Sequence, residues 1–279
     1  MAINYQQLKH RHFPAIVCKY DAGLAAKIAR GFGAGLTPQL AADDAPYLAG
    51  QTMLPMAAIA LADGEFWQQR PDTGIDWRRI VHAEEAITIH AALPSQGTVI
   101  VTQHVEEIFD RGPERGAVML QKQFLNATDG TPLVTIDVTT ILKGDGGFGG
   151  KPYVPLKTAI PEDRAADAVI ELRSPANDEH AAYRLSAGLS ITDDLPPGKA
   201  MMRGLGCFGL AGRAVLKLVC NNDVRRLRKM AVRYAGAMLT DETVRIELWN
   251  VDAGVAVFRM RAIERDALIL NNCCVEFDV

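Results

Sequence analysis

The chain has 279 residues and a formal net charge of −3, with 48% hydrophobic and 23% charged residues. These values are typical of a globular protein and allow one large domain or two smaller ones. They give no basic footprint, which argues against nucleic acid as a partner. No apolar run reaches the roughly 18 residues of a membrane span, and no apolar segment follows the basic N-terminal residues as in a secretory signal. The five cysteines lack C-x-x-C spacing, which predicts a cytoplasmic protein with reduced thiols and no metal site.

The first half of the chain is predicted to fold as one long buried helix followed by antiparallel strands. Residues 21–31 have an acidic start and a glycine end, which predicts that they form a short helix. Residues 51–69 begin with an apolar run in which Pro55 argues against a strand, so they predict the buried helix. Residues 80–144 alternate in hydropathy and contain an Asp-Gly turn at 129–130, which predicts about four strands. A curved sheet wrapping one central helix is the economical arrangement.

A glycine-rich break at residues 144–155 separates this half from a second one with the same order of elements. The second half is predicted to hold a short helix at 178–185 and a long apolar helix at 208–219. Its predicted strands are 166–172, 225–234, 243–250, 255–263 and 267–276. Because each half places strands after a buried helix, the sequence predicts a structural duplication.

Residues 183–213 form the strongest candidate for a ligand site. They predict a short helix, a loop and a glycine-punctuated entry into the long apolar helix. The first N–H groups of a helix lack acceptors and favour a partial negative charge on a ligand. Asp193 and Asp194 offer carboxylates near this entry and Arg203 offers a cation. A solvated turn and a structural ion pair are the alternative roles for these three residues.

With its segments in this order, the chain resembles the MaoC-like, type 2, R-specific enoyl-CoA hydratases from about residue 20 to the C-terminus. Each motif that carries the resemblance is weak alone, and their order and spacing give it its strength. The motifs are Tyr20-Asp21, Gly31 to Gly35, His82 to Glu85 (where the family often has HGEQ), Asp110 to Gly112, Gly146 to Gly150, Tyr183 to Ser186, Gly204-Leu205, Phe208-Gly209, Arg213, Glu242-Thr243 and Leu248-Trp249.

The resemblance implies an α+β, double hotdog fold: two antiparallel β-sheets, each wrapping a long central helix and packed together. Residues 1–150 would form an N-terminal hotdog that accommodates the acyl chain, and residues 151–279 a C-terminal hotdog that bears the site. The ligand would be a fatty-acyl or sterol side-chain CoA thioester, with no further cofactor, and the assembly a homodimer or a hetero-oligomer with a homologue. The implied substrate-binding residues are Tyr183, Gly188, Arg203, Gly204, Leu205, Gly206 and Phe208.

The catalytic segment of the family reads roughly YRLSGDxNPLH, and this chain departs from it. In the same register Gly188 stands at the Asp position, Ser190 at the Asn position and Asp193 at the His position. Glycine cannot hold a proton, so the usual acid–base pair cannot operate as written. The candidate catalytic residues are therefore Asp193, Asp194 and Ser190.

Three functions remain open at this point. The protein is a hydratase or dehydratase with relocated acid–base groups, or it runs another hotdog reaction such as thioester hydrolysis, isomerisation or cyclisation. The third is a non-catalytic acyl-CoA-binding homologue or partner subunit. His82, Glu84 and Glu85 look like a proton-transfer set, but the resemblance puts the catalytic centre elsewhere and favours a structural role for them.

Overall fold

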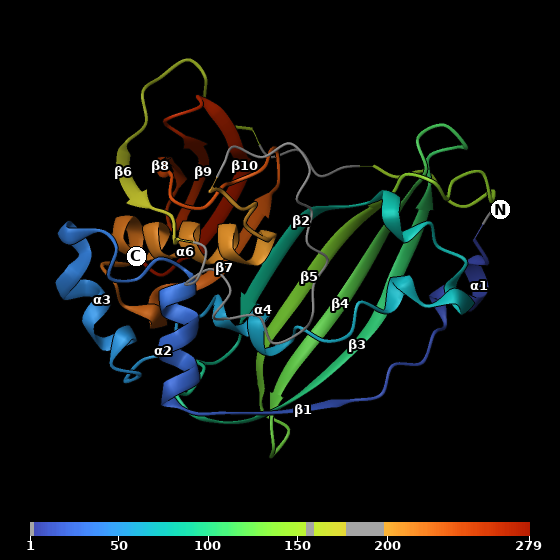
Figure 1. Cartoon of the computed structure of the whole chain (residues 1–279), viewed down its shortest axis with the longest axis horizontal. Coiled ribbons are helices and arrows are strands. Elements are labelled where there is room, and N and C mark those ends of the chain that lie inside the picture. The colour runs from blue at the N-terminus through green and yellow to red at the C-terminus, as the bar shows by residue number, and fades with distance from the viewer. Residues whose placement is uncertain (1–2, 155–158, 177–197) are drawn as a thin grey trace.

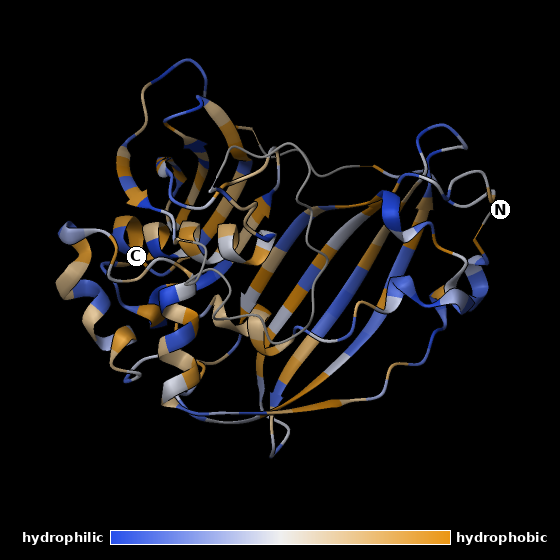
Figure 2. Cartoon of the chain, viewed as in Figure 1, coloured by the Kyte–Doolittle hydropathy of each residue, from blue (hydrophilic) through white to orange (hydrophobic). Residues whose placement is uncertain are grey.

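The computed structural model describes residues 3–154, 159–176 and 198–279, and its strands form a single antiparallel sheet (Figure 1). The ten strands lie in the order β1-β3-β4-β5-β2-β7-β10-β9-β8-β6. Their bounds are β1 Ile16–Tyr20, β2 Ile80–Ile89, β3 Gly97–Asp110, β4 Ala117–Ala127, β5 Pro132–Leu142, β6 Ala168–Arg173, β7 Leu227–Arg233, β8 Thr243–Asp252, β9 Val255–Ala262 and β10 Ala267–Phe277. The strands predicted from alternation are confirmed to within a few residues, and Figure 2 shows that alternation along β2 to β5.

The expectation of two separate sheets packed together is wrong. Strand β2 of the first half pairs with β7 of the second, from Glu84 opposite Arg233 to Thr88 opposite Lys229. This pairing joins the two sets of strands into one continuous sheet. The reason is that the exposed edge of each set carries unpaired N–H and C=O groups, which the other edge satisfies. The predicted division at residue 150 stays a prediction.

The long central helix of the second half is confirmed, but that of the first half is not. Helix α6 spans Gly204–Cys220, and nearly all of its residues are buried. In the first half, α4 spans only Ala57–Leu61 and is followed by short 3-10 turns rather than by helix up to residue 69. Asp63-Gly64 follows directly after α4, and both residue types disfavour a helix interior. The other α-helices of the described residues are α1 Tyr5–Lys9, α2 Ala22–Gly31 and α3 Ala41–Leu48.

Helix α6 is held in the core by one buried ion pair and one close approach. The guanidinium of Arg213 donates to both carboxylate oxygens of Asp44 in α3, at 2.8 and 2.6 Å, and to the carbonyl of Phe32 at 3.1 Å. The two charged side chains are 2% and 3% exposed. A Cβ at Gly209 would lie 2.2 Å from the ring of Phe32, so only glycine lets that ring pack against the helix. These contacts fix α6 against α2 and α3 of the first half.

Among the described residues, no helix is long and apolar enough to cross a membrane.

Candidate functional site

Half of the predicted site residues can be located in the structure. Arg203 is the N-cap residue of α6, and Gly204, Leu205, Gly206 and Phe208 lie in its first two turns. Phe208 is fully buried in the core. The other predicted site residues lie outside the described residues: Tyr183, Gly188, Ser190, Asp193 and Asp194. Their roles stay predictions.

The N-terminus of α6 has hydrogen-bond donors that no described residue uses. No side chain among the described residues caps the helix, and the N–H groups of Gly206 and Cys207 donate to the carbonyl of Arg203. Within the described part of the chain, the N–H groups of Gly204 and Leu205 have no acceptor. Donors of this kind can hold a ligand oxygen that carries partial negative charge.

A tyrosine from the end of β7 lies directly against this first turn. A Cβ at Gly204 would lie 2.9 Å from Cζ and 3.0 Å from Oη of Tyr234, so glycine is required for the two to approach. The Tyr234 hydroxyl donates a hydrogen bond of 2.9 Å to the carboxylate of Glu85 in β2. Glu85 is buried, at 4% exposure. The chain thus brings a tyrosine and a glutamate, 149 residues apart, to the start of α6.

Two further groups complete what we call the seam cluster: His82, Glu85, Arg203 and Tyr234. His82 Nε2 is buried and has no hydrogen-bond partner among the described residues, although the side chain as a whole is 38% exposed. It lies 3.8 Å from Glu85 Oε2, and its ring centroid is 4.8 Å from that of Tyr234. Arg203 Nη1 lies 3.4 Å from the carboxylate of Asp63, just after α4.

Burial strongly shifts the pKa values of Glu85, His82 and Tyr234. Desolvation raises the pKa of Glu85 to about 7, against the lowering effect of the Tyr234 hydrogen bond, and the Asp63 charge adds to the rise. Desolvation, helped by the Arg203 cation, lowers the pKa of His82 to about 4. Burial also raises the pKa of Tyr234 well above 10. Near pH 6 all three groups are therefore uncharged, which suits hydrogen bonding and proton exchange with a ligand.

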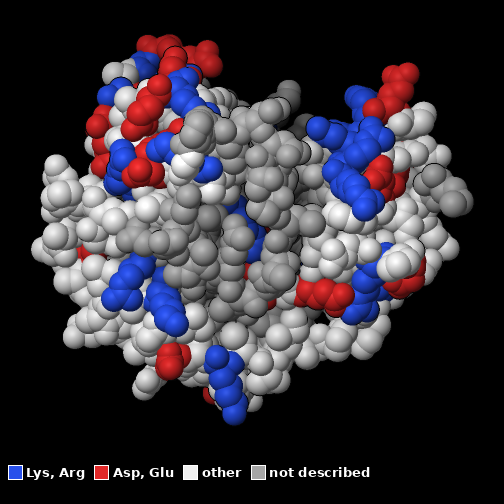
Figure 3. Space-filling view, viewed as in Figure 1, with Lys and Arg blue, Asp and Glu red and all other residues white. Residues whose placement is uncertain are grey.

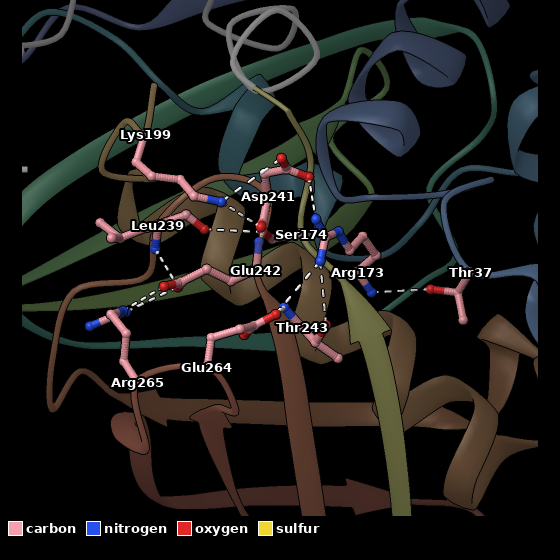
Figure 4. A network of polar contacts seen from close by, with 10 residues as sticks. All are labelled: Thr37, Arg173, Ser174, Lys199, Leu239, Asp241, Glu242, Thr243, Glu264 and Arg265. Atoms are coloured by element: carbon pink, nitrogen blue, oxygen red, sulfur yellow. Dashed lines mark hydrogen bonds and ion pairs between the residues drawn. The ribbon is translucent and has the colours of Figure 1, made fainter. Parts of the chain in front are cut away.

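A second polar network fixes the chain on both sides of the undescribed segment 177–197 (Figure 4). Its centre is the clamp loop, residues 238–242. Before the segment, the Ser174 N–H donates to the carbonyl of Glu242 at 2.8 Å, and its hydroxyl donates to the carbonyl of Leu239 at 3.0 Å. After the segment, Lys199 Nζ donates to the carbonyl of Asp241 at 2.6 Å.

The clamp loop also reaches the entry of α6. The N–H of Met202 donates to the carbonyl of Met238 at 2.8 Å. The loop is itself held by the buried carboxylate of Glu242, which accepts from the Leu239 N–H and from the Arg265 guanidinium, both at 3.0 Å. One loop therefore sets where the segment with the predicted catalytic residues leaves and re-enters the described structure.

Sequence reasoning set aside His82 and Glu85 and missed Tyr234 and Asp63. One signal was present for Glu85: it shares a face of β2 with Ile87, and both are buried. A carboxylate on the core-facing side of a strand indicates either an ion pair or a functional role. The proximity of Tyr234 to Glu85 had no local signal, because it depends on the pairing of β2 with β7.

Known proteins are similar to this chain in sequence. Residues 43–144 match the MFE-2 hydratase 2 N-terminal domain. The chain is 26% identical over 203 residues to the probable enoyl-CoA hydratase 2 of Dictyostelium discoideum, covering 69% of this chain and 68% of the relative. It is 27% identical over 250 residues to the peroxisomal multifunctional enzyme type 2 of Drosophila melanogaster, covering 84% of this chain but 41% of that enzyme.

Solved structures show the same fold. A MaoC-like dehydratase from Phytophthora capsici superposes with a TM-score of 0.83 at 19% identity, over 98% of this chain and 97% of that one. A conserved Mycobacterium tuberculosis protein described as having a double hotdog fold superposes with a TM-score of 0.56 at 15% identity, over 95% and 94% of the two chains. The chain is therefore similar to MaoC-like and MFE-2 hydratase 2 proteins, and its fold is that of the double hotdog structures on which it superposes.

Proposed function

We propose that the chain binds an acyl-CoA thioester at the N-terminus of α6 and acts as an R-specific 2-enoyl-CoA hydratase or 3-hydroxyacyl-CoA dehydratase. The observation that carries the proposal is the pair of N–H groups on Gly204 and Leu205, which have no acceptor among the described residues and lie beside the seam cluster. When water adds to C3 of an enoyl thioester, negative charge develops on the thioester oxygen. Donors already in place for that oxygen lower the barrier.

The acid–base residues belong to the same proposal. Asp193 or Asp194 would take the proton from the attacking water and return a proton to C2, with Ser190 beside them. The clamp loop supports this assignment, because it ties residues 174 and 199, on either side of those carboxylates, to the start of α6. Tyr183, Gly188, Gly206 and Phe208 are proposed to line the thioester site together with Arg203.

The surroundings of the site are proposed from the family. Residues 1–150 would accommodate the acyl chain and residues 151–279 would hold the thioester, in a homodimer or in a complex with a homologue. The proposed location is the cytoplasm, although relatives include enzymes named as peroxisomal. On the face shown in Figure 3, positive and negative side chains are interspersed, which agrees with a small-molecule ligand rather than nucleic acid.

The experiment follows loss of the conjugated thioester absorbance when the purified protein is mixed with medium-chain or sterol-like trans-2-enoyl-CoA. We expect turnover that Asp193→Asn or Asp194→Asn abolishes. Asp137→Asn is the matched control, because Asp137 is an exposed carboxylate on β5 that pairs with Lys122. Acyl-CoA binding without turnover would identify a binding subunit instead. The absence of both acyl-CoA binding and turnover would refute the acyl-CoA site.

A further inference from the structure

The hydroxyl of Tyr234 lies beside the first turn of α6. Its oxygen would be 3.0 Å from a Cβ placed on Gly204, the first residue of the helix. The residue is partly buried and packs against the main core. A phenol hydroxyl has one proton to donate and can accept another bond. In the structure that single proton goes to Glu85.

The charged and titratable groups around this pair come from several elements. His82 lies beside Glu85 on β2, and the charges of Asp63 and Arg203 act on Glu85 from the turn after α4 and from the start of α6. Cys207 of α6 and Cys273 of β10 lie close enough to Tyr234 to raise its pKa if they ionise. Both thiols stay neutral, because burial raises the pKa of each to about 12. Glu85 is therefore the group next to Tyr234 whose charge changes near neutral pH.

We propose that Tyr234 is a third hydrogen-bond donor to the carbonyl oxygen of the bound thioester, beside the N–H groups of Gly204 and Leu205, and that Glu85 is the residue that positions its proton. This inference rests on the proposed acyl-CoA site. It makes Tyr234, in the second half of the chain, a donor to the thioester oxygen, and Glu85, in the first half, the residue that controls that donor.

Glu85 controls the direction of the Tyr234 hydroxyl through its own protonation state. When Glu85 is protonated, its O–H donates to Tyr234 Oη, and the tyrosine proton is free to donate to the thioester oxygen. When Glu85 is ionised, its carboxylate accepts the tyrosine proton, and the thioester loses that donor. No bond between heavy atoms is made or broken: when Glu85 ionises, its O–H bond breaks and the proton passes to water.

The test compares two variants with a matched control. Tyr234→Phe removes only the hydroxyl, and we expect kcat for trans-2-enoyl-CoA to fall about 10²–10³-fold, as for loss of one oxyanion donor. Binding of the unreactive saturated acyl-CoA should weaken much less, because the charge on the oxygen develops during the reaction. Tyr5→Phe is the control: Tyr5 donates to Glu107 at 2.7 Å in an equivalent pair remote from α6.

The second variant tests Glu85 through the pH profile. In the natural chain, kcat/KM should fall as pH rises through about 7, where Glu85 ionises. The amide of Glu85→Gln keeps donating to Tyr234 Oη at every pH, so this fall should disappear. At pH 8 the kcat/KM of Glu85→Gln should then be about tenfold higher than that of the natural chain. The reason is that about nine in ten Glu85 side chains are ionised one unit above their pKa.

A spectroscopic measurement needs no turnover. The infrared carbonyl band of bound saturated acyl-CoA should shift to lower frequency at pH 6 and return toward its free position at pH 8. In Tyr234→Phe it should not respond to pH. Turnover by the natural chain together with a Tyr234→Phe kcat within twofold, or an unchanged pH fall in Glu85→Gln, would overturn this inference alone. Absence of acyl-CoA binding by the natural chain would instead overturn the proposed function.

Discussion

Replacing Glu85 with glutamine should stabilise the protein at alkaline pH, although Glu85 accepts a hydrogen bond in the fold. Its pKa is about 7 in the folded protein against 4.5 for an ordinary glutamate. The folded state therefore binds the proton more tightly, and stability from this group falls as pH rises from about 4.5 to about 7. One pKa unit corresponds to 1.36 kcal/mol, so ionised Glu85 costs about 3 kcal/mol above that window. The side chain is 4% exposed, so solvent screening is small.

His82 gives the opposite slope. Its pKa is lowered in the fold, so its contribution to stability is present above its unfolded value and is lost as pH falls toward about 4. Between these limits the two slopes offset each other in the natural chain. In Glu85→Gln only the His82 slope remains, and stability should rise with pH between about 4 and 6.5.

The assay is denaturant unfolding of both proteins across pH 4 to 8. We expect the unfolding free energy of Glu85→Gln, minus that of the natural chain, to grow by about 3 kcal/mol over that range. Glu84→Gln is the control: Glu84 meets Arg233 at 2.7 Å and is 28% exposed, so its loss should not produce that growth. A difference between Glu85→Gln and the natural chain that stays constant with pH would refute the buried, proton-binding state assigned to Glu85.

Three further predictions concern α6. Asp44→Ala leaves the buried guanidinium of Arg213 without its carboxylate and should lower the free energy of unfolding by denaturant by about 3–5 kcal/mol. Asp43→Ala breaks a partly exposed pair with Lys217 and should lower it by less than about 1 kcal/mol. Equal losses in the two variants would contradict the burial argument. Gly209→Ala places a Cβ 2.2 Å from the Phe32 ring and should lower the free energy of unfolding by about 1–3 kcal/mol or more. An unchanged melting temperature would contradict this close approach. Cys207 should resist alkylation at pH 8 until the protein unfolds, because burial raises its pKa to about 12; modification in the native state, seen by mass spectrometry, would contradict this.

The sequence was most informative where a structure depends on neighbouring residues. The turn at Asp129-Gly130 forms as predicted, with Gly130 at a φ of 89°, and its flanking strands β4 and β5 pair across it. The helix after Asp21 forms with that carboxylate accepting from the Leu24 N–H at 2.8 Å. Caps, turns and alternation act over a few residues, so the sequence alone determined these elements.

Only the tertiary structure decided how distant elements meet. The pairing of β2 with β7 joins the two sets of strands, and it alone brings Glu85 to Tyr234 at the start of α6. Strand order and register depend on which edges satisfy each other's hydrogen bonds, and alternation along one strand does not encode its partner. The sequence therefore determined the local elements and the resemblance to a family, and the folded chain decided which side chains lie at the start of α6.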